Sequence, residues 1–190
     1  MPAKARIGKR QVRQKQKLSV ITVVAVVLVF AVTVYLIITS MRDIGGVNSA
    51  SGAVAPSVSL VSLDGSLVTV PDTNRQATVL FAMAYWCGRC IPEAQALARL
   101  EREYGGALRV VVVDVDPSST PDIIQDFIDI TGENNLTWAF DRDGSFSRSY
   151  GIRALDTTII VDRNGREVYR DGYPSSYEVL RSQLEEIISA

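Results

Sequence analysis

Residues 85–90, Tyr-Trp-Cys-Gly-Arg-Cys, decide the fold of this 190-residue chain and contain both of its cysteines. An apolar run rich in strand-forming residues, 77–83, leads into this stretch. Leu97, Leu100 and Tyr104 follow it at spacings of three and four residues, which indicate one face of a helix. The two cysteines are therefore expected where a strand ends and a helix begins.

A helix start changes the chemistry of a cysteine. The first backbone N–H groups of a helix are unpaired and carry partial positive charge, which stabilises an anion such as a thiolate. The thiolate attacks disulfides, so Cys87 is the candidate nucleophile. Cys90 follows one turn later and could attack a mixed disulfide at Cys87, which would release the partner in reduced form. The charge of Arg89 between them should favour the Cys87 thiolate further.

Other uses of such a cysteine pair fit the sequence less well. A structural disulfide that closes so short a loop would constrain the unfolded chain little. A zinc site needs about four nitrogen or sulfur ligands, and the chain has two cysteines and no histidine. Two buried, unreactive thiols are the remaining alternative, although a strand-to-helix junction favours redox chemistry. We therefore expect no metal and no cofactor.

Charge is unevenly distributed along the chain. The formal net charge is −1, but residues 1–17 carry seven positive charges and no acid. The rest of the chain has 13 arginines and 21 acidic residues. A basic head on an acidic body is compatible with nucleic-acid binding, but the segment that follows explains it better, so we expect no nucleic-acid partner.

Residues 18–41 are 24 positions without a charged side chain. A bilayer core about 30 Å thick requires roughly 20 helical residues, so we expect a transmembrane helix here. Its basic flank would stay in the cytoplasm and the body of the chain would lie outside. A cleaved signal peptide is the alternative, because 53–55 (Ala-Val-Ala) resembles a cleavage site. The apolar run exceeds the usual h-region of about 7–15 residues, which favours an uncleaved signal anchor.

These features predict four parts of the chain, in a single-pass membrane protein. They are a basic cytoplasmic head (1–17), a transmembrane helix (18–41), a flexible linker rich in small residues (42–56) and an extracytoplasmic domain (57–190). Outside the cytosol, dithiols tend to be oxidised unless something supplies electrons. A chain with no cysteine outside the pair avoids wrong pairings there.

The domain alternates between expected strands and helices. Asp64-Gly65 predicts a hairpin turn between strands at 58–63 and 67–70. The near-continuous apolar run at 108–115 is typical of a strand buried on both faces. Further strands are expected at 137–140, 157–161 and 167–169, with helices after Thr120, through Phe146 and Tyr150, and after a capping box at 175–178. This order predicts a three-layer α/β sandwich around a central sheet.

Two segments of the domain resemble one protein family. Residues 86–90 with Glu93, and the expected hairpin at 157–165 (Thr-Thr-Ile-Ile-Val-Asp-Arg-Asn-Gly), are similar to the TlpA/ResA group of thioredoxin-like thiol–disulfide oxidoreductases. That group is membrane-anchored and includes reductants of cytochrome c maturation. The resemblance covers residues 57–190 and implies a thioredoxin-like sandwich with a central mixed sheet. A lone CxxC is weak evidence, but this combination behind a membrane anchor is specific.

The resemblance also implies roles for single residues. Cys87 would be the exposed nucleophile, Cys90 the resolving thiol of a redox-active disulfide, and Trp86 a shield beside them. Glu93 matches an acidic residue that tunes thiol ionisation or relays protons in the family. Residues three apart on a helix are neighbours, so Glu93 should lie under Cys90. The alternative is an acid that is favoured only by the helix dipole.

The chain departs from the family at several positions. Arg89 stands where many relatives have proline, and Pro92 requires the helix to begin at about residue 88 or 89. Relatives usually have a cis-proline before the Thr-Thr strand, but here Leu155 and Asp156 occupy this loop. A cis bond to Asp156 would cost about 2.5–4 kcal/mol, so the bond is trans or the loop is strained. Asp156 either faces the cysteines and raises the thiolate pKa, or is a solvent-facing turn residue.

These observations predict an extracytoplasmic reductant of protein disulfides that uses Cys87 and Cys90. By resemblance, a membrane electron donor would re-reduce it and apocytochrome c is a plausible substrate. Two alternatives are a peroxiredoxin-like peroxidase and a thioredoxin-fold binding protein with little turnover. The peroxidase would require a threonine at position 84, where this chain has alanine. The missing proline is the best support for the binding protein.

Overall fold

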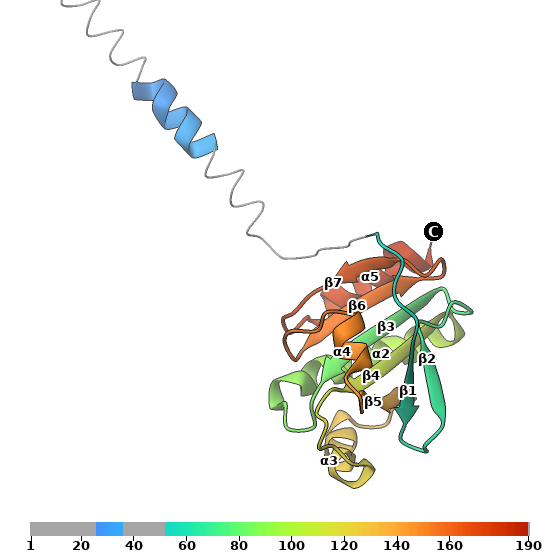
Figure 1. The fold of residues 1–190 in the computed structure, drawn as a ribbon. Helices are drawn as coiled ribbons and strands as arrows, with labels where there is room; N and C mark the ends of the chain where they lie inside the picture. The colour runs from blue at the N-terminus through green and yellow to red at the C-terminus, as the bar shows by residue number, and fades with distance from the viewer. Residues whose placement is uncertain (1–25, 36–51, 190) are drawn as a thin grey trace, which may run out of the picture. The chain divides into compact units, whose positions relative to one another are not determined.

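The structure, a computed structural model, describes residues 26–35 and 52–189 (Figure 1). The chain forms two units that divide after Gly46, and each is described by itself. Residues 26–35 are helical and expose apolar side chains such as Phe30. No helix in the described ranges is both long and apolar enough to cross a bilayer. The expected head at 1–17, the rest of the expected membrane segment and residues 42–51 lie outside these ranges.

Seven strands form the central sheet of the second unit. Their order is β2-β1-β5-β4-β3-β6-β7. β3, β4 and β5 are parallel to one another, and the other neighbouring pairs are antiparallel. The strands are β1 (Val58–Ser62), β2 (Leu67–Val70), β3 (Ala77–Met83), β4 (Leu108–Asp114), β5 (Thr137–Phe140), β6 (Thr157–Asp162) and β7 (Glu167–Arg170). The sheet is therefore mixed, as expected.

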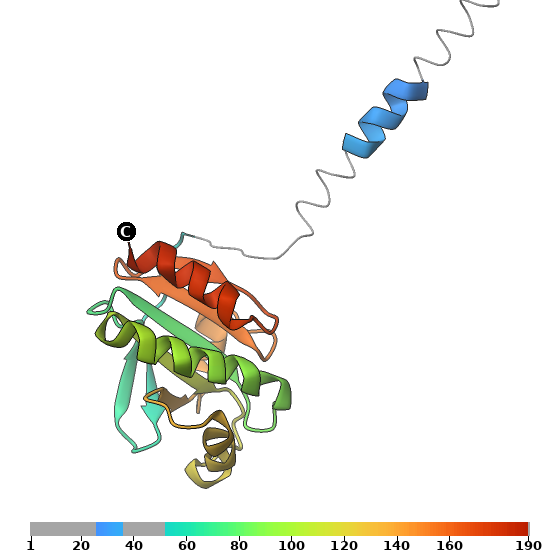
Figure 2. The same cartoon turned by 180° about the vertical axis from the view of Figure 1, so that it is seen from behind.

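Helices cover both faces of the sheet. α2 (Ile91–Tyr104), α3 (Pro121–Thr131) and α5 (Tyr177–Ile188) contribute to one apolar core, and Figure 2 shows α2 and α5 in front of the strands. α4 (Ser145–Ser149) supplies Phe146 to a second core on the opposite face. Short 3₁₀ turns, η1 (Gly88–Cys90) and η2 (Gly105–Ala107), flank α2. The three-layer α/β sandwich is thus confirmed.

β3 lies in the middle of this sandwich and is buried along its whole length. Val79, Phe81 and Met83 belong to the core under α2, whereas Leu80 and Ala82 belong to the core under α4. Alternate side chains of a strand point to opposite faces, so a strand covered on both sides must be apolar throughout. This requirement explains the uninterrupted run that leads to the cysteines.

Replacing Phe81 by alanine should destabilise the domain strongly. Its side chain is fully buried in the same core as both cysteines, and Phe→Ala changes in cores cost about 3–5 kcal/mol. Chemical denaturation of the oxidised protein measures this loss. Leu67→Ala is the control, because Leu67 is exposed and its truncation should change the free energy of unfolding by less than about 0.5 kcal/mol. Equal effects of the two substitutions would contradict the assignment of this core.

The end of the expected linker belongs to the folded domain. Gly52 N–H donates to the Glu167 carbonyl and Glu167 N–H donates to the Ala53 carbonyl, both at 3.0 Å. Ala55 N–H donates to the carbonyl of Gly165 at 2.7 Å. Residues 52–55 therefore pair with the start of β7 and with the turn before it, and the folded domain begins before the expected boundary at residue 57.

The capping of the last helix also differs from expectation. Ser176, rather than Ser175, is the N-cap of α5, and its side chain accepts a hydrogen bond from Val179 N–H. The backbone N–H of Ser175 instead donates to Glu93, 82 positions earlier in the sequence. The sequence predicted the helix start to within one residue, and the displaced serine joins the functional site.

Candidate active site

Cys87 and Cys90 form a disulfide at the junction between β3 and α2. β3 ends at Met83, and Cys87 N–H donates to the Ala84 carbonyl at 2.8 Å, which closes a turn. η1 then starts at Gly88 and passes directly into α2. Because this turn already begins at residue 88, Pro92 lies among the first positions of the α-helix, where its missing N–H costs little.

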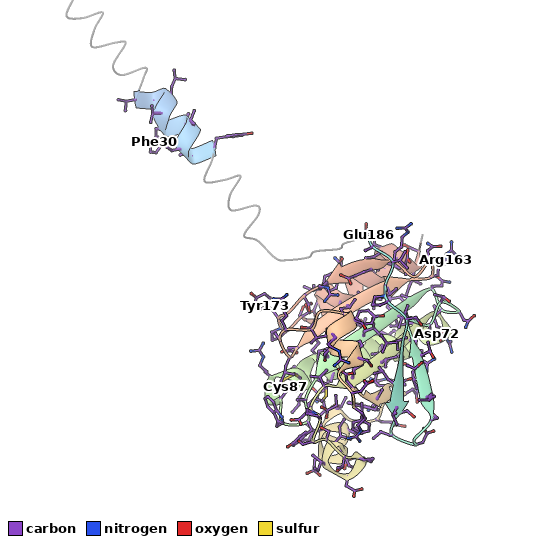
Figure 3. All side chains as sticks on the ribbon, in the orientation of Figure 1. Phe30, Asp72, Cys87, Arg163, Tyr173 and Glu186 are labelled. Carbon is purple, nitrogen blue, oxygen red and sulfur yellow. A yellow bond between two sulfur atoms is a disulfide. The ribbon has the colours of Figure 1, made fainter. Side chains whose placement is uncertain are left out.

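The two cysteines differ in access. Cys90 is fully buried and Cys87 is 4% exposed, so Cys87 is less exposed than the resemblance implied. Cys87 nevertheless lines a surface hollow of about 400 Å³ with Trp86, Gly88, Arg89, Ala154 and Leu155. Figure 3 labels Cys87 at one edge of the domain. A sulfur of the partner protein can therefore approach Cys87 and not Cys90.

The residues that line this hollow come from two segments that are far apart in the sequence. Trp86 immediately precedes Cys87, and Leu155 lies in the loop before β6. Trp86 is 61% exposed, and its indole Nε1 donates to Asp116 Oδ2 at 2.7 Å. This bond holds the indole ring at the hollow that Cys87 also lines. Asp116 was not foreseen from the sequence, and no motif marks it.

Glu93 lies in the first turn of α2 and is buried beneath the disulfide-bearing turn. Thr158 Oγ1 donates to its Oε1 at 2.6 Å, and Ser175 N–H donates to its Oε2 at 2.9 Å. The pKa of Glu93 is raised to about 8, mainly by burial and also by the negative charges of Asp171 and Asp156, while the two hydrogen bonds oppose this rise. Glu93 is therefore a buried, hydrogen-bonded acid with a raised pKa, and the helix dipole alone does not explain its position.

Asp156 is buried and paired. Its side chain has no exposed surface, and Arg89 Nε donates to its Oδ2 at 3.2 Å. The expectation of a solvent-facing turn residue is therefore wrong. Burial raises the pKa of the Asp156 carboxyl, while the hydrogen bond from Arg89 opposes this shift. The positive charge expected at Cys87 is consequently shared with an acid.

The backbone at Asp156 also departs from the usual geometry. The described residues contain one cis peptide bond, Val70–Pro71, so the bond before Asp156 is trans. Asp156 has a φ of 66°, in the left-handed region that aspartate tolerates better than most residues. Its N–H donates to the Ala82 carbonyl at 2.9 Å, which attaches the loop to the end of β3. This geometry turns the side chain inward, toward Arg89.

A second group of polar residues was missed from the sequence. Asp171 accepts hydrogen bonds from Thr158 N–H and from the hydroxyl of Tyr169, and Ser175 Oγ donates to its Oδ2. Thr158 and Ser175 thus connect Asp171 to Glu93. The Thr-Thr pair was quoted from the sequence only as part of a hairpin. In the described ranges, no group of three or more His, Cys, Asp or Glu side chains is arranged to hold a metal ion.

Several known proteins are similar to this chain in sequence or in structure. The protein named "Mercury resistance operon ORF3" from Streptomyces lividans is 28% identical over 137 residues, which cover 70% of each chain. The thiol-disulfide oxidoreductase ResA of Bacillus thuringiensis is 22% identical and covers 72% of this chain and 78% of its own. A putative thiol:disulfide interchange protein DsbE from Chlorobium tepidum superimposes with a TM-score of 0.64 at 26% identity, covering 72% of this chain and 96% of its own.

A thioredoxin-like mixed sheet with a Cys-x-x-Cys disulfide at the strand–helix junction defines a thiol–disulfide oxidoreductase. Residues 50–188 match the model of the Redoxin family. The chain belongs to that family.

Proposed function

We propose that the chain reduces disulfide bonds of other proteins outside the cytoplasm while anchored to the cell membrane. The observation that carries the proposal is the Cys87–Cys90 disulfide, in which Cys87 alone lines a surface hollow. A hollow walled by Trp86 and Leu155 suits an extended polypeptide better than a small peroxide. Behind the disulfide, the pKa of Glu93 is raised to about 8, so this group exchanges a proton near that pH, and burial also raises the pKa of Asp156.

The reaction follows from the positions of the two sulfurs. In the reduced protein, the Cys87 thiolate attacks one sulfur of the substrate disulfide and forms a mixed disulfide, and the displaced substrate thiolate takes a proton. Cys90 then loses its proton and attacks the sulfur of Cys87. This step breaks the mixed disulfide, releases the second substrate thiol and re-forms the Cys87–Cys90 bond. A membrane electron donor then supplies two further electrons, which reduce the Cys87–Cys90 disulfide and replace those passed to the substrate.

Sequence supports the membrane location. The uncharged segment 18–41 follows a basic head, a pattern that retains positive residues on the cytoplasmic side. The helix at 26–35 lies within this segment and exposes its apolar side chains. Such a location places the dithiol where protein disulfides form, and apocytochrome c, whose haem-binding cysteines must be reduced, is the substrate class that we propose.

Measurement of the reduction potential tests the direction of electron flow. The full-length protein is equilibrated with glutathione or dithiothreitol buffers, and the fraction of the Cys87–Cys90 disulfide is measured at each ratio. A potential well below that of the glutathione couple is expected for a reductant. A potential well above it would overturn the proposal in favour of an oxidant that makes disulfides.

One observation favours a second candidate, a binding protein with little turnover. Asp156 occupies the place where relatives have proline. The peptide bond before it is trans, and its buried side chain forms an ion pair with Arg89. Turnover of a disulfide-bonded protein such as insulin separates the two functions. Multiple turnovers with dithiothreitol as electron source support the oxidoreductase, whereas binding without turnover would support the second candidate.

A further inference from the structure

One oxygen of Asp156 has no hydrogen-bond partner although it is buried. Oδ2 is bound by Arg89, but Oδ1 is inaccessible and unpaired when both nearby acids are treated as carboxylates. A buried charged oxygen without a hydrogen-bond partner destabilises the fold, so the great majority of such atoms have a partner. A missing proton is the simplest explanation, because two carboxylates cannot bond to each other but a carboxyl group and a carboxylate can.

Glu93 is the group that can donate this bond. It lies within hydrogen-bonding reach of Asp156, and that contact lowers the Asp156 pKa. Its own oxygens accept bonds from Thr158 and Ser175, but each oxygen of a carboxyl group has capacity for a further contact. Burial and two neighbouring acids raise the pKa of Glu93 to about 8. Glu93 therefore retains its proton at neutral pH.

We propose that Glu93 and Asp156 share one proton behind the disulfide, and that Asp156 is a positioning residue that connects this proton to Cys87 through Arg89. The inference deepens the function proposed above and rests on it for its role in turnover. While the proton lies on Glu93, Asp156 is anionic and holds Arg89. When the proton moves to Asp156, Arg89 loses its charged partner and its guanidinium becomes available to the Cys87 thiolate.

All charged groups that face the pair belong to this mechanism. Arg89 approaches from η1, Glu93 from α2, and Asp171 and Tyr169 from β7 and the turn after it. The three acids are buried, whereas the side chain of Arg89 is 61% exposed and reaches Asp156 from the surface. At least one acid must stay protonated there, because like charges at short range in a dry environment cannot all ionise. Asp171 is already bound by the Tyr169 and Ser175 hydroxyls, which leaves Glu93 and Asp156 to hold the proton.

Carboxyl titration of the oxidised, full-length protein tests the proposal. Glutamate and aspartate carboxyl groups are labelled with ¹³C, and their chemical shifts are followed by NMR from pH 4 to pH 10. In the wild type, Glu93 should titrate near pH 8. In Asp156→Asn, which keeps a residue suited to positive φ, the loss of a like charge should weaken proton binding by Glu93 at least tenfold. Asp156→Gly, which adopts positive φ freely, replaces this variant if the asparagine protein does not fold.

Cys87 reactivity provides the second measurement. In the reduced protein, the pH midpoint of Cys87 alkylation by iodoacetamide should move to lower pH in Asp156→Asn and to higher pH in Arg89→Ala. A purely structural role for Asp156 would change the amount of folded protein and leave both midpoints in place. Asp116→Asn is the matched control, because Asp116 is an acid that accepts a hydrogen bond from Trp86, a residue of the same hollow, and not from Arg89.

The outcomes separate this inference from the proposed function. A Glu93 that titrates near its ordinary value of 4.5, or that is unchanged in Asp156→Asn, would overturn the shared proton. An equal shift in Asp116→Asn would also overturn it, because the effect would then be non-specific. The oxidised protein undergoes no turnover during the titration, so a positive result stands even if the reductase assay fails.

Discussion

Cys87→Ser should lower the turnover of a protein disulfide by roughly a thousandfold or more, because a serine hydroxyl cannot replace a thiolate nucleophile. Cys87 is the cysteine that lines the surface hollow, and the fully buried Cys90 cannot reach a substrate first. The measurement is the rate of insulin reduction with dithiothreitol as electron source, after subtraction of the uncatalysed rate.

Cys90→Ser is the matched variant and should fail in a different way. Cys87 would still attack the substrate, but no second thiol would release the mixed disulfide. The covalent complex should therefore accumulate, and non-reducing electrophoresis detects it. Accumulation of such a complex in Cys87→Ser, and not in Cys90→Ser, would show that Cys90 is the nucleophile and contradict the assignment.

Glu93→Gln should flatten the pH dependence of stability between about pH 5 and pH 8. The folded-state pKa of Glu93 is about 8, above its ordinary value of 4.5, so the folded protein holds a proton that the unfolded protein has lost. The stability that this group contributes is complete below pH 4.5 and is lost as the pH rises toward 8. The slope should approach a loss of about 1.4 kcal/mol per pH unit.

Chemical denaturation of the oxidised protein at several pH values measures this slope. Glu101, Asp114 and Asp156 also have raised pKa values, so the difference between the wild type and Glu93→Gln isolates the contribution of Glu93. Glu178→Gln is the control, because Glu178 lies at a similar position in α5 and its pKa is lowered. A wild-type stability that rises from pH 5 to pH 8 would contradict the raised pKa.

The fold could be predicted from local signals. These signals depend only on residues that are close together in the sequence, such as the apolar run at 77–83, the glycine turns and the helical spacing after the cysteines. The order of the predicted strands and helices then permits few topologies. Boundaries were less certain where two serines could cap one helix, because Ser175 and Ser176 offer the same side chain and tertiary contacts decide between them.

Sequence reasoning identified Cys87 and Cys90, and the family resemblance together with helix spacing identified Glu93, but neither predicted the contacts behind them. Arg89 and Asp156 are 67 positions apart, and Glu93 and Thr158 are 65 positions apart. No periodicity relates residues at such distances. The inward direction of Asp156 depends on a positive φ, which the sequence does not specify for aspartate. Local patterns therefore located the dithiol, whereas its electrostatic environment required the three-dimensional structure.

The pairing of residues 52–55 with the start of the edge strand β7 and with the turn before it has a practical consequence. An uncovered edge strand offers free N–H and C=O groups to any other strand, and intermolecular pairing at such edges leads to aggregation. Here the chain's own leading segment occupies part of that edge. A shortened protein that starts at Ser57 would retain the dithiol but lose this protection, so self-association of such a fragment would reflect the truncation and not a physiological oligomer.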